Sequence, residues 1–164
     1  MYFWIASLTA CSPAPTDKML FDAATDSANA ALTPAAHQQA ATLFYKVYES
    51  YPASSLAGDA VFQSAKALTS AQQLQQAIER FAVMREKFPS HKDAPLALFL
   101  TGFIYNNDLQ DSVKAKEVYQ TFLSQYPAHE LAMSARFELE TMGKPPEEVV
   151  PKVQLDTSAH GVHH

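Results

Sequence analysis

Serine, histidine and carboxylate side chains are the groups in this 164-residue chain that could do catalytic chemistry. None of them lies in a nucleophile elbow, in a metalloprotease helix motif or in a glycine-rich phosphate loop. The carboxylates Glu147-Glu148 and Glu138/Glu140 could act as an acid–base pair only inside a cleft, and we interpret them as solvated. The sequence therefore predicts a protein that is not an enzyme and that uses no cofactor.

The six histidines are the remaining candidates for metal ligands. His160, His163 and His164 lie close together, but one flexible tract preorganises a metal site poorly, and we interpret it as a solvated tail. His91 and His129 each follow a proline by two residues, which is typical of a surface turn. We therefore expect no metal site.

The single cysteine, Cys11, ends the sequence Leu8-Thr9-Ala10-Cys11, which follows a short apolar run. This order of aliphatic, hydroxyl, small residue and cysteine resembles the lipobox of bacterial lipoproteins, in which the thiol receives a diacylglyceryl group. The run is shorter than a usual signal core and no Lys or Arg precedes it. We expect residues 1–10 to be a signal peptide and Cys11 to carry several acyl chains, enough for stable membrane anchoring. The alternative is an apolar terminus in which Cys11 has no such role.

The composition narrows the remaining classes of function. The net charge is −5 and no basic stripe is present, so nothing indicates nucleic-acid binding. Only four glycines occur, and alanine is abundant, which favours helix over sheet. The length and the 48% hydrophobic share are those of one domain with a packed core.

A small residue, an aromatic residue and a proline recur three times along the chain. The three copies are Ala40…Phe44…Pro52, Ala77…Phe81…Pro89 and Ala115…Tyr119…Pro127. The prolines lie 37 and then 38 residues apart. A period of this length predicts stacked helical hairpins, with the aromatic stripe Phe44, Phe81 and Tyr119 in the core.

The residues after each proline also repeat. Alanine stands five and eight residues after it and phenylalanine ten residues after it, at Ala57, Ala60 and Phe62, at Ala94, Ala97 and Phe99, and at Ala132, Ala135 and Phe137. Small residues allow helices to approach closely. We expect helices over about 34–51, 55–68, 71–88, 93–105, 112–126 and 130–142. Thr33 is the N-cap of the first, and Asn106-Asn107-Asp108 is a break that follows the fourth.

The pattern resembles the tetratricopeptide repeat (TPR), whose second helix carries Ala-x-x-x-Phe and ends at proline. The first-helix motif of that family is matched best by Leu98-x-x-Thr101-Gly102-x-x-Tyr105. The resemblance implies an all-α, right-handed superhelix of stacked helix-turn-helix hairpins over residues 34–143. We expect a flexible tether over 11–33, with at most a short helix near 19–31, and a disordered tail over 144–164.

The phrase Tyr51-Pro52-Ala53-Ser54, followed by Ala57 and Ala60, is similar to the envelope branch of this family. That branch includes the outer-membrane β-barrel assembly lipoprotein and the Tol–Pal-associated coordinator, although the assembly lipoprotein is usually longer. In this family the helices after each proline line a concave groove. The matching outward offsets carry Phe62, Lys66, Phe99, Phe103 and Asn106.

Phenylalanines in place of the family's Lys and Asn indicate an apolar groove for a helix or an extended peptide, not a carboxylate clamp. The alternative is that some of these phenylalanines pack between hairpins.

The sequence therefore predicts a membrane-anchored scaffold that binds protein partners in the bacterial cell envelope, in outer-membrane assembly or envelope maintenance. We expect it to face the periplasm from the outer membrane. Two alternatives stay open: a self-associating structural or cell-division adaptor, and a cytoplasmic adaptor if the N-terminus is not a signal.

Overall fold

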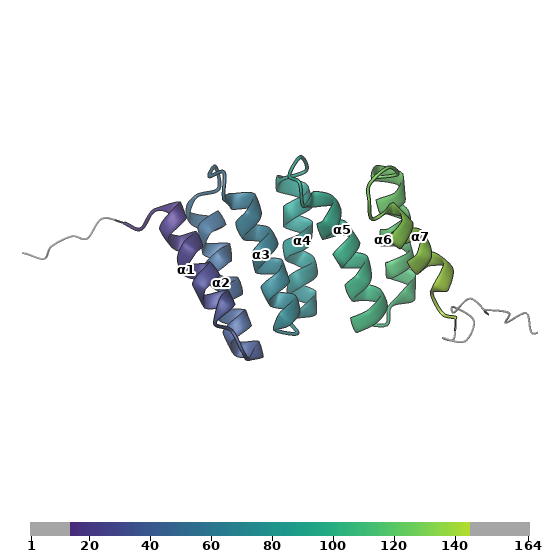
Figure 1. Ribbon diagram of the computed structural model, residues 1–164, viewed down its shortest axis with the longest axis horizontal. Helices are drawn as coiled ribbons and strands as arrows, with labels where there is room; N and C mark the ends of the chain where they lie inside the picture. Colours follow the sequence, from purple (N-terminus) through teal and green to yellow (C-terminus); the bar gives the residue numbers. More distant parts are fainter. Residues whose placement is uncertain (1–13, 145–164) are drawn as a thin grey trace, which may run out of the picture.

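The computed structural model describes residues 14–144, which form a row of helices (Figure 1). The helices are α1 (Asp17–Asn29), α2 (Pro34–Ser50), α3 (Ala57–Ser70), α4 (Leu74–Lys87), α5 (Ala94–Phe103), the π-helix η1 (Ile104–Asp108), α6 (Ser112–Gln125) and α7 (Ala132–Thr141). Residues 14–144 contain no strand, so the predicted all-α helical repeat is confirmed. None of the helices in this range combines the length and the apolar character needed to cross a membrane.

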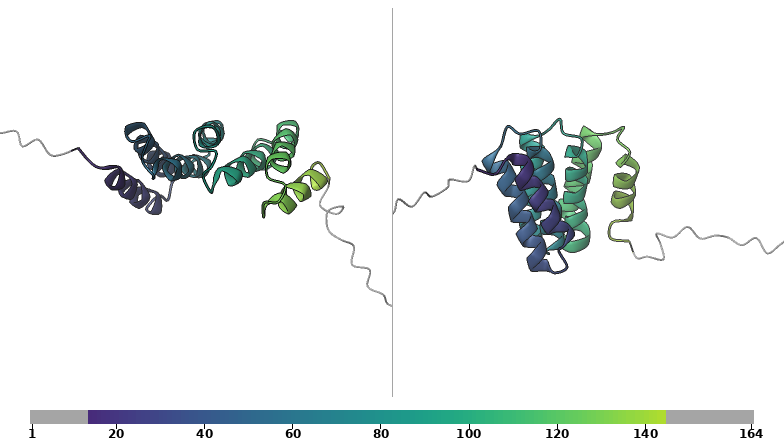
Figure 2. Two further views of the ribbon diagram at one scale, coloured as in Figure 1. Left: turned by 90° about the horizontal axis from the view of Figure 1, so that it is seen from above. Right: turned by 60° about the vertical axis from the view of Figure 1, so that its left-hand side comes forward.

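Consecutive helices pair as antiparallel hairpins, α1 with α2, α3 with α4, and α5 with α6. Seen from above, the helices form two layers, with α2, α4 and α6 on one side and α1, α3, α5 and α7 on the other (Figure 2, left). The end helices α1 and α7 project furthest on their side, so this side of the array is concave. The helices that follow the prolines therefore face the concave surface.

The predicted small–aromatic stripe lies in the core. Ala40, Ala77 and Ala115 are fully buried, and Phe44, Phe81 and Tyr119 are 3%, 1% and 0% exposed. The alanines let neighbouring helices approach closely, and the aromatic rings fill the space between hairpins. The core interpretation of this stripe is confirmed.

The turns between hairpins use one capping device three times. The side chain two residues after each proline, Ser54, His91 or His129, accepts a hydrogen bond from the backbone N–H two residues further on, at distances of 3.1, 3.2 and 3.2 Å. Each bond satisfies a backbone donor beside a helix that has no side-chain cap of its own. The prediction that His91 and His129 lie in surface turns is confirmed in this form.

Residues 17–29 form α1, where the sequence predicted a flexible tether with at most a short helix. Ala24 is fully buried, and the Phe21 and Phe44 rings pack edge to face at 5.4 Å. Tyr51 Oη donates to the Pro15 carbonyl oxygen at 2.6 Å, and Ser54 Oγ donates to Asp17 Oδ2 at 2.5 Å. The packed face mixes large apolar, small and polar side chains, and this segment lacks the small–aromatic–proline repeat from which the other helices were predicted.

The prediction that Asn106-Asn107-Asp108 interrupts the helical structure is wrong, because these residues belong to η1. The Leu109 N–H donates to the Ile104 carbonyl oxygen, five residues back, at 2.9 Å. A π-helical turn holds one residue more than an α-helical turn. This accounts for the change in proline spacing from 37 to 38 residues.

Candidate functional site: the concave groove

The concave side carries a groove of about 480 Å³ between α1, α3 and the α5–η1 segment. Its floor is apolar, with Phe44, Phe81 and Ile104 beneath it. These three side chains are almost fully buried, so the groove reaches down to the hydrophobic core. Its polar side chains include His37 and Lys66.

Two successive repeats line the groove with the same positions. Eleven, fourteen and fifteen residues after the preceding proline, α3 contributes Gln63, Lys66 and Ala67, and the α5–η1 segment contributes Leu100, Phe103 and Ile104. The second set is wholly apolar, whereas the first contains two polar side chains. One wall of the groove is therefore polar at its edge and the opposite wall is apolar.

The π-helix completes the apolar wall. Phe103 is the last residue of α5, and Ile104 and Asp108 are the first and last residues of η1. Phe103 lines the groove and is 41% exposed. π-helical turns occur often at functional sites, which agrees with their position here.

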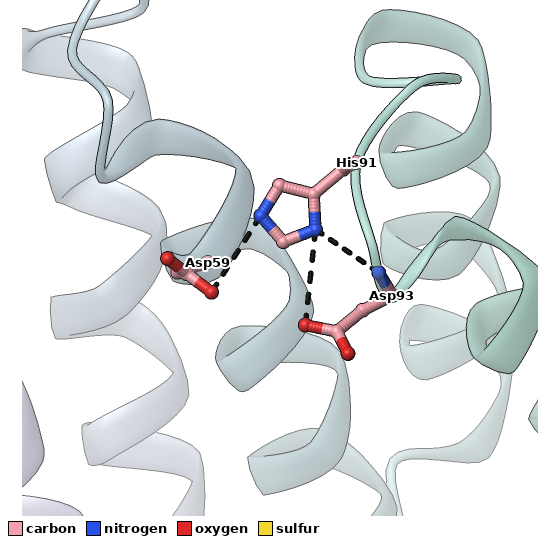
Figure 3. A group of neighbouring side chains, drawn as sticks. All are labelled: Asp59, His91 and Asp93. Atoms are coloured by element: carbon pink, nitrogen blue, oxygen red, sulfur yellow. Dashed lines mark hydrogen bonds and ion pairs between the residues drawn. The ribbon is translucent and has the colours of Figure 1, made fainter.

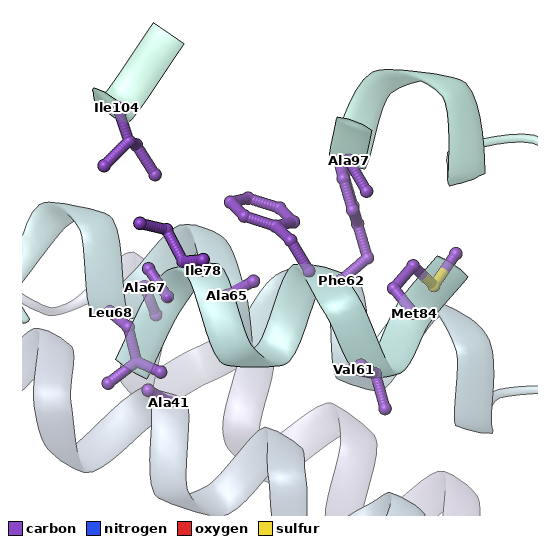
Figure 4. Close-up of a cluster of buried hydrophobic side chains, with 12 residues drawn as sticks. Ala41, Val61, Phe62, Ala65, Ala67, Leu68, Ile78, Met84, Ala97 and Ile104 are labelled. Carbon is purple, nitrogen blue, oxygen red and sulfur yellow. The ribbon is translucent and has the colours of Figure 1, made fainter. Parts of the chain in front are cut away.

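Two of the five predicted groove residues, Lys66 and Phe103, line this groove. Phe62 is not among the lining residues: its side chain lies in the core (Figure 4), 4% exposed, and its ring centre is 5.8 Å from that of Phe81. Phe99 also packs between helices, with its ring 5.4 Å from Tyr119 and 5.9 Å from Phe122. For these two phenylalanines the packing alternative is correct.

Asn106, the fifth predicted residue, points toward the last helix. Its Nδ2 donates to Glu138 Oε2 at 3.1 Å and so ties η1 to α7. It stabilises the position of the π-helix and does not line the groove. The exposed Lys66 Nζ lies 5.8 Å from the Phe62 ring centre, so this lysine also covers the buried aromatic.

Among the lining residues that the sequence prediction did not include are Ala28, His37 and Asp108. His37 and Ala28 belong to the first hairpin, whose packing the sequence did not reveal. Asp108 could have been found by extending the periodic offsets through the extra residue of η1. Cys11 and the predicted tail histidines lie outside the described residues.

A second group of polar side chains, Asp59, His91 and Asp93, lies between α3 and the turn before α5 (Figure 3). His91 Nδ1 accepts the Asp93 backbone N–H at 3.2 Å, and Nε2 lies 3.5 Å from Asp59 Oδ1. Lys92 Nζ also lies 3.6 Å from Asp59 Oδ1. Both imidazole nitrogens thus contact protein groups, and we interpret the three side chains as holding the turn before α5 against α3.

The tetratricopeptide-repeat family profile matches residues 59–91 and 96–129. The first match covers nearly all of α3 together with α4, and the second covers most of α5 together with η1 and α6. No curated protein matches the chain significantly. The two matched segments are the two repeats that form the opposite walls of the groove.

Proposed function

We propose that this chain, which contains two tetratricopeptide repeats, binds a segment of a protein partner in its concave groove and does so at a membrane of the bacterial cell envelope. Tetratricopeptide repeats are generally non-catalytic scaffolds for protein–protein interaction, and they supply the general function. The groove supplies the binding surface, and Cys11 supplies the anchor.

The observation that carries the groove proposal is the exposure of Phe103 beside an apolar cavity. A large aromatic side chain on a concave surface is costly to leave in water and is a frequent anchor of interfaces. A cavity of about 480 Å³ has room for a few apolar side chains of a partner segment. The partner would insert these side chains against the wall formed by Phe103, Leu100 and Ile104.

The polar side chains at the edges of the groove could fix the orientation of a bound partner segment. Lys66 lies on the α3 wall and Asp108 at the end of η1, so opposite charges stand at the two sides. A partner segment that carries an acidic residue beside its apolar anchor would meet Lys66. We therefore expect an amphipathic helix or an extended peptide of mixed charge.

The first experiment compares two variants of exposed apolar side chains. Phe103→Ala should weaken capture of the partner from solubilised envelope membranes by more than about 2 kcal/mol if Phe103 is a hot spot, with little change in melting temperature. Met19→Ala is the control, because Met19 is also exposed, at 61%, but lies on α1 outside the groove. Equal capture by the wild type and by a folded Phe103→Ala protein would refute the groove proposal.

The second experiment tests the anchor. Expression in a bacterium with lipoprotein-processing enzymes should yield a Cys11-acylated protein in the detergent phase, and Cys11→Ser should transfer it to the soluble fraction. The support for this proposal is the lipobox-like sequence at residues 8–11. Intact-mass data that show Met1 retained and no lipid would replace the envelope scaffold with a cytoplasmic one.

A further inference from the structure

The last helix within residues 14–144, α7, exposes an apolar face that α3 and α5 bury. Phe137 stands ten residues after its proline, as do Phe62 in α3 and Phe99 in α5. Those two rings are covered by the antiparallel helix that follows, through Phe81 and Tyr119. Phe137 is 53% exposed and Met133, one turn earlier, is 78% exposed.

A groove of about 500 Å³ runs beside this face, between the start of α6 and the end of α7. Counted from the prolines, Lys116 and Gln120 of this groove correspond to Ala41 and Tyr45 of α2. Helix α4 packs there in the first repeat, with the Arg80 guanidinium 3.5 Å from the Tyr45 ring centre. Within the described residues, the C-terminal end of the array thus has a site for one more antiparallel helix.

The charges on α7 restrict which helix could occupy that site. Arg136 stands at the position of Val61 and Leu98, which are 0% and 1% exposed. Glu140 similarly stands at the position of Ala65 and Gly102, which are buried. A helix with an apolar packing face, like that of α4 or α6, would bury both charges without partners, which is strongly unfavourable. The covering helix must therefore present an acid to Arg136 and a base to Glu140.

We propose that the occupant is α7 of a second copy of the chain, packed antiparallel across a two-fold axis near Phe137. Arg136 and Glu140 are four residues apart on the exposed face of the helix. An antiparallel pairing therefore brings Arg136 of each copy to Glu140 of the other. The same two-fold axis brings the two Phe137 side chains into contact with each other, beside Met133. The face is self-complementary, as an isologous interface requires.

The patch is small, because one helix of ten residues carries most of it. Stable interfaces usually bury about 1,200–2,000 Å² in total, and this contact lies at or below the low end of that range. The dimer should therefore dissociate on dilution. This proposal is independent of the concave groove, because Phe137 is not among the residues that line it.

The first test is sedimentation equilibrium of the full chain carrying Cys11→Ser, which excludes lipid and disulfide links between copies. The protein should pass from monomer to dimer as its concentration rises, and Phe137→Asp should hold it as a monomer with an unchanged melting temperature. Leu32→Asp is the matched control, because Leu32 is 92% exposed at the other end of the array. A protein that stays monomeric up to about 0.5 mM, or one whose dimer is lost on Phe103→Ala, overturns the proposal.

The charge pair gives a sharper test. Arg136→Glu and Glu140→Arg should each raise the dissociation constant by at least about fivefold, because both symmetric pairs turn from attraction to repulsion at once. The double variant that carries both changes should return to within about twofold of the parent, since each copy again offers opposite charges. The helices do not pair in this register if the single charge reversals leave the dissociation constant unchanged. The same conclusion follows if the double variant dimerises no more tightly than the single variants.

Discussion

The two matched repeats share one packing scheme but differ in what they expose. In the first, α3 and α4 enclose Phe81 and place Lys66 at the groove. In the second, α5, η1 and α6 enclose Tyr119, and Phe103 stands at the position of Lys66. The second repeat also holds one more residue, which η1 accommodates. The two repeats therefore carry similar residues at their buried positions and different residues at the positions that line the groove.

The largest test of this comparison removes the central ring of each repeat. Phe81→Ala and Tyr119→Ala should each lower the free energy of unfolding by about 3–5 kcal/mol, the usual cost of emptying a large core position. Chemical denaturation of residues 14–144 measures both. Losses below about 1 kcal/mol at both positions would mean that the repeat phase assigned to the two helices is wrong.

The next test uses one glycine from each repeat, Gly58 and Gly102, each of which lies close to a side chain from another segment. A Cβ at position 102 would lie 2.8 Å from Tyr119 Cε1, and one at position 58 would lie 2.7 Å from His91 Cδ2. The Tyr119 ring is fully buried, whereas the His91 side chain lies in a surface turn and can shift at the cost of its contacts with Asp59 and Asp93. Gly102→Ala should therefore destabilise by about 1–2 kcal/mol even after the helix-propensity gain of alanine.

Gly58→Ala is the paired measurement, and we expect a net change within about 0.5 kcal/mol of zero, since the propensity gain offsets the lost contact. Thermal unfolding of the two variants under one condition compares them directly. A greater loss at position 58 than at position 102 would mean that the His91 turn is more rigid than the core of the second repeat.

The smallest effect concerns the hydroxyl that distinguishes Tyr119 from Phe81. Tyr119 Oη is buried and has no hydrogen-bond partner among the described residues. Burial, with a contribution from the Glu138 carboxylate, raises the pKa of this phenol above its ordinary value of 10.0. Above about pH 10 the unfolded chain therefore loses this proton before the folded one does, and stability falls as pH rises.

Tyr119→Phe should change stability at pH 7 by less than about 1 kcal/mol, because no hydrogen bond to a described residue is lost. Between about pH 9 and 11 the variant should lose less stability than the parent, with Tyr126→Phe as the control. Urea titrations at a series of pH values measure this difference. An identical alkaline loss in the parent and in Tyr119→Phe would show that the buried phenol does not contribute to it.

The sequence predicted most of the helices within a few residues, because their signals are local. Ala-x-x-x-aromatic spacing marks a buried helical face, and the prolines mark the turns. Helix α1 was expected only as a short helix near 19–31 within a flexible tether, because this segment lacks the small–aromatic–proline repeat. The contacts that fix it, through Pro15 and Asp17, reach residues 36 and 37 positions away. Such long-range contacts leave no periodic trace in a single sequence.

For the groove, the sequence alone determined which helix face repeats, and thus that Lys66 and Phe103 occupy equivalent positions. Only the tertiary structure decided that Phe62 and Phe99 lie inward. A helix of the concave layer packs both against its own hairpin partner and against the preceding hairpin, so only a narrow stripe of it stays exposed. Helical periodicity defines a face, but the depth to which neighbouring hairpins cover that face depends on contacts between repeats.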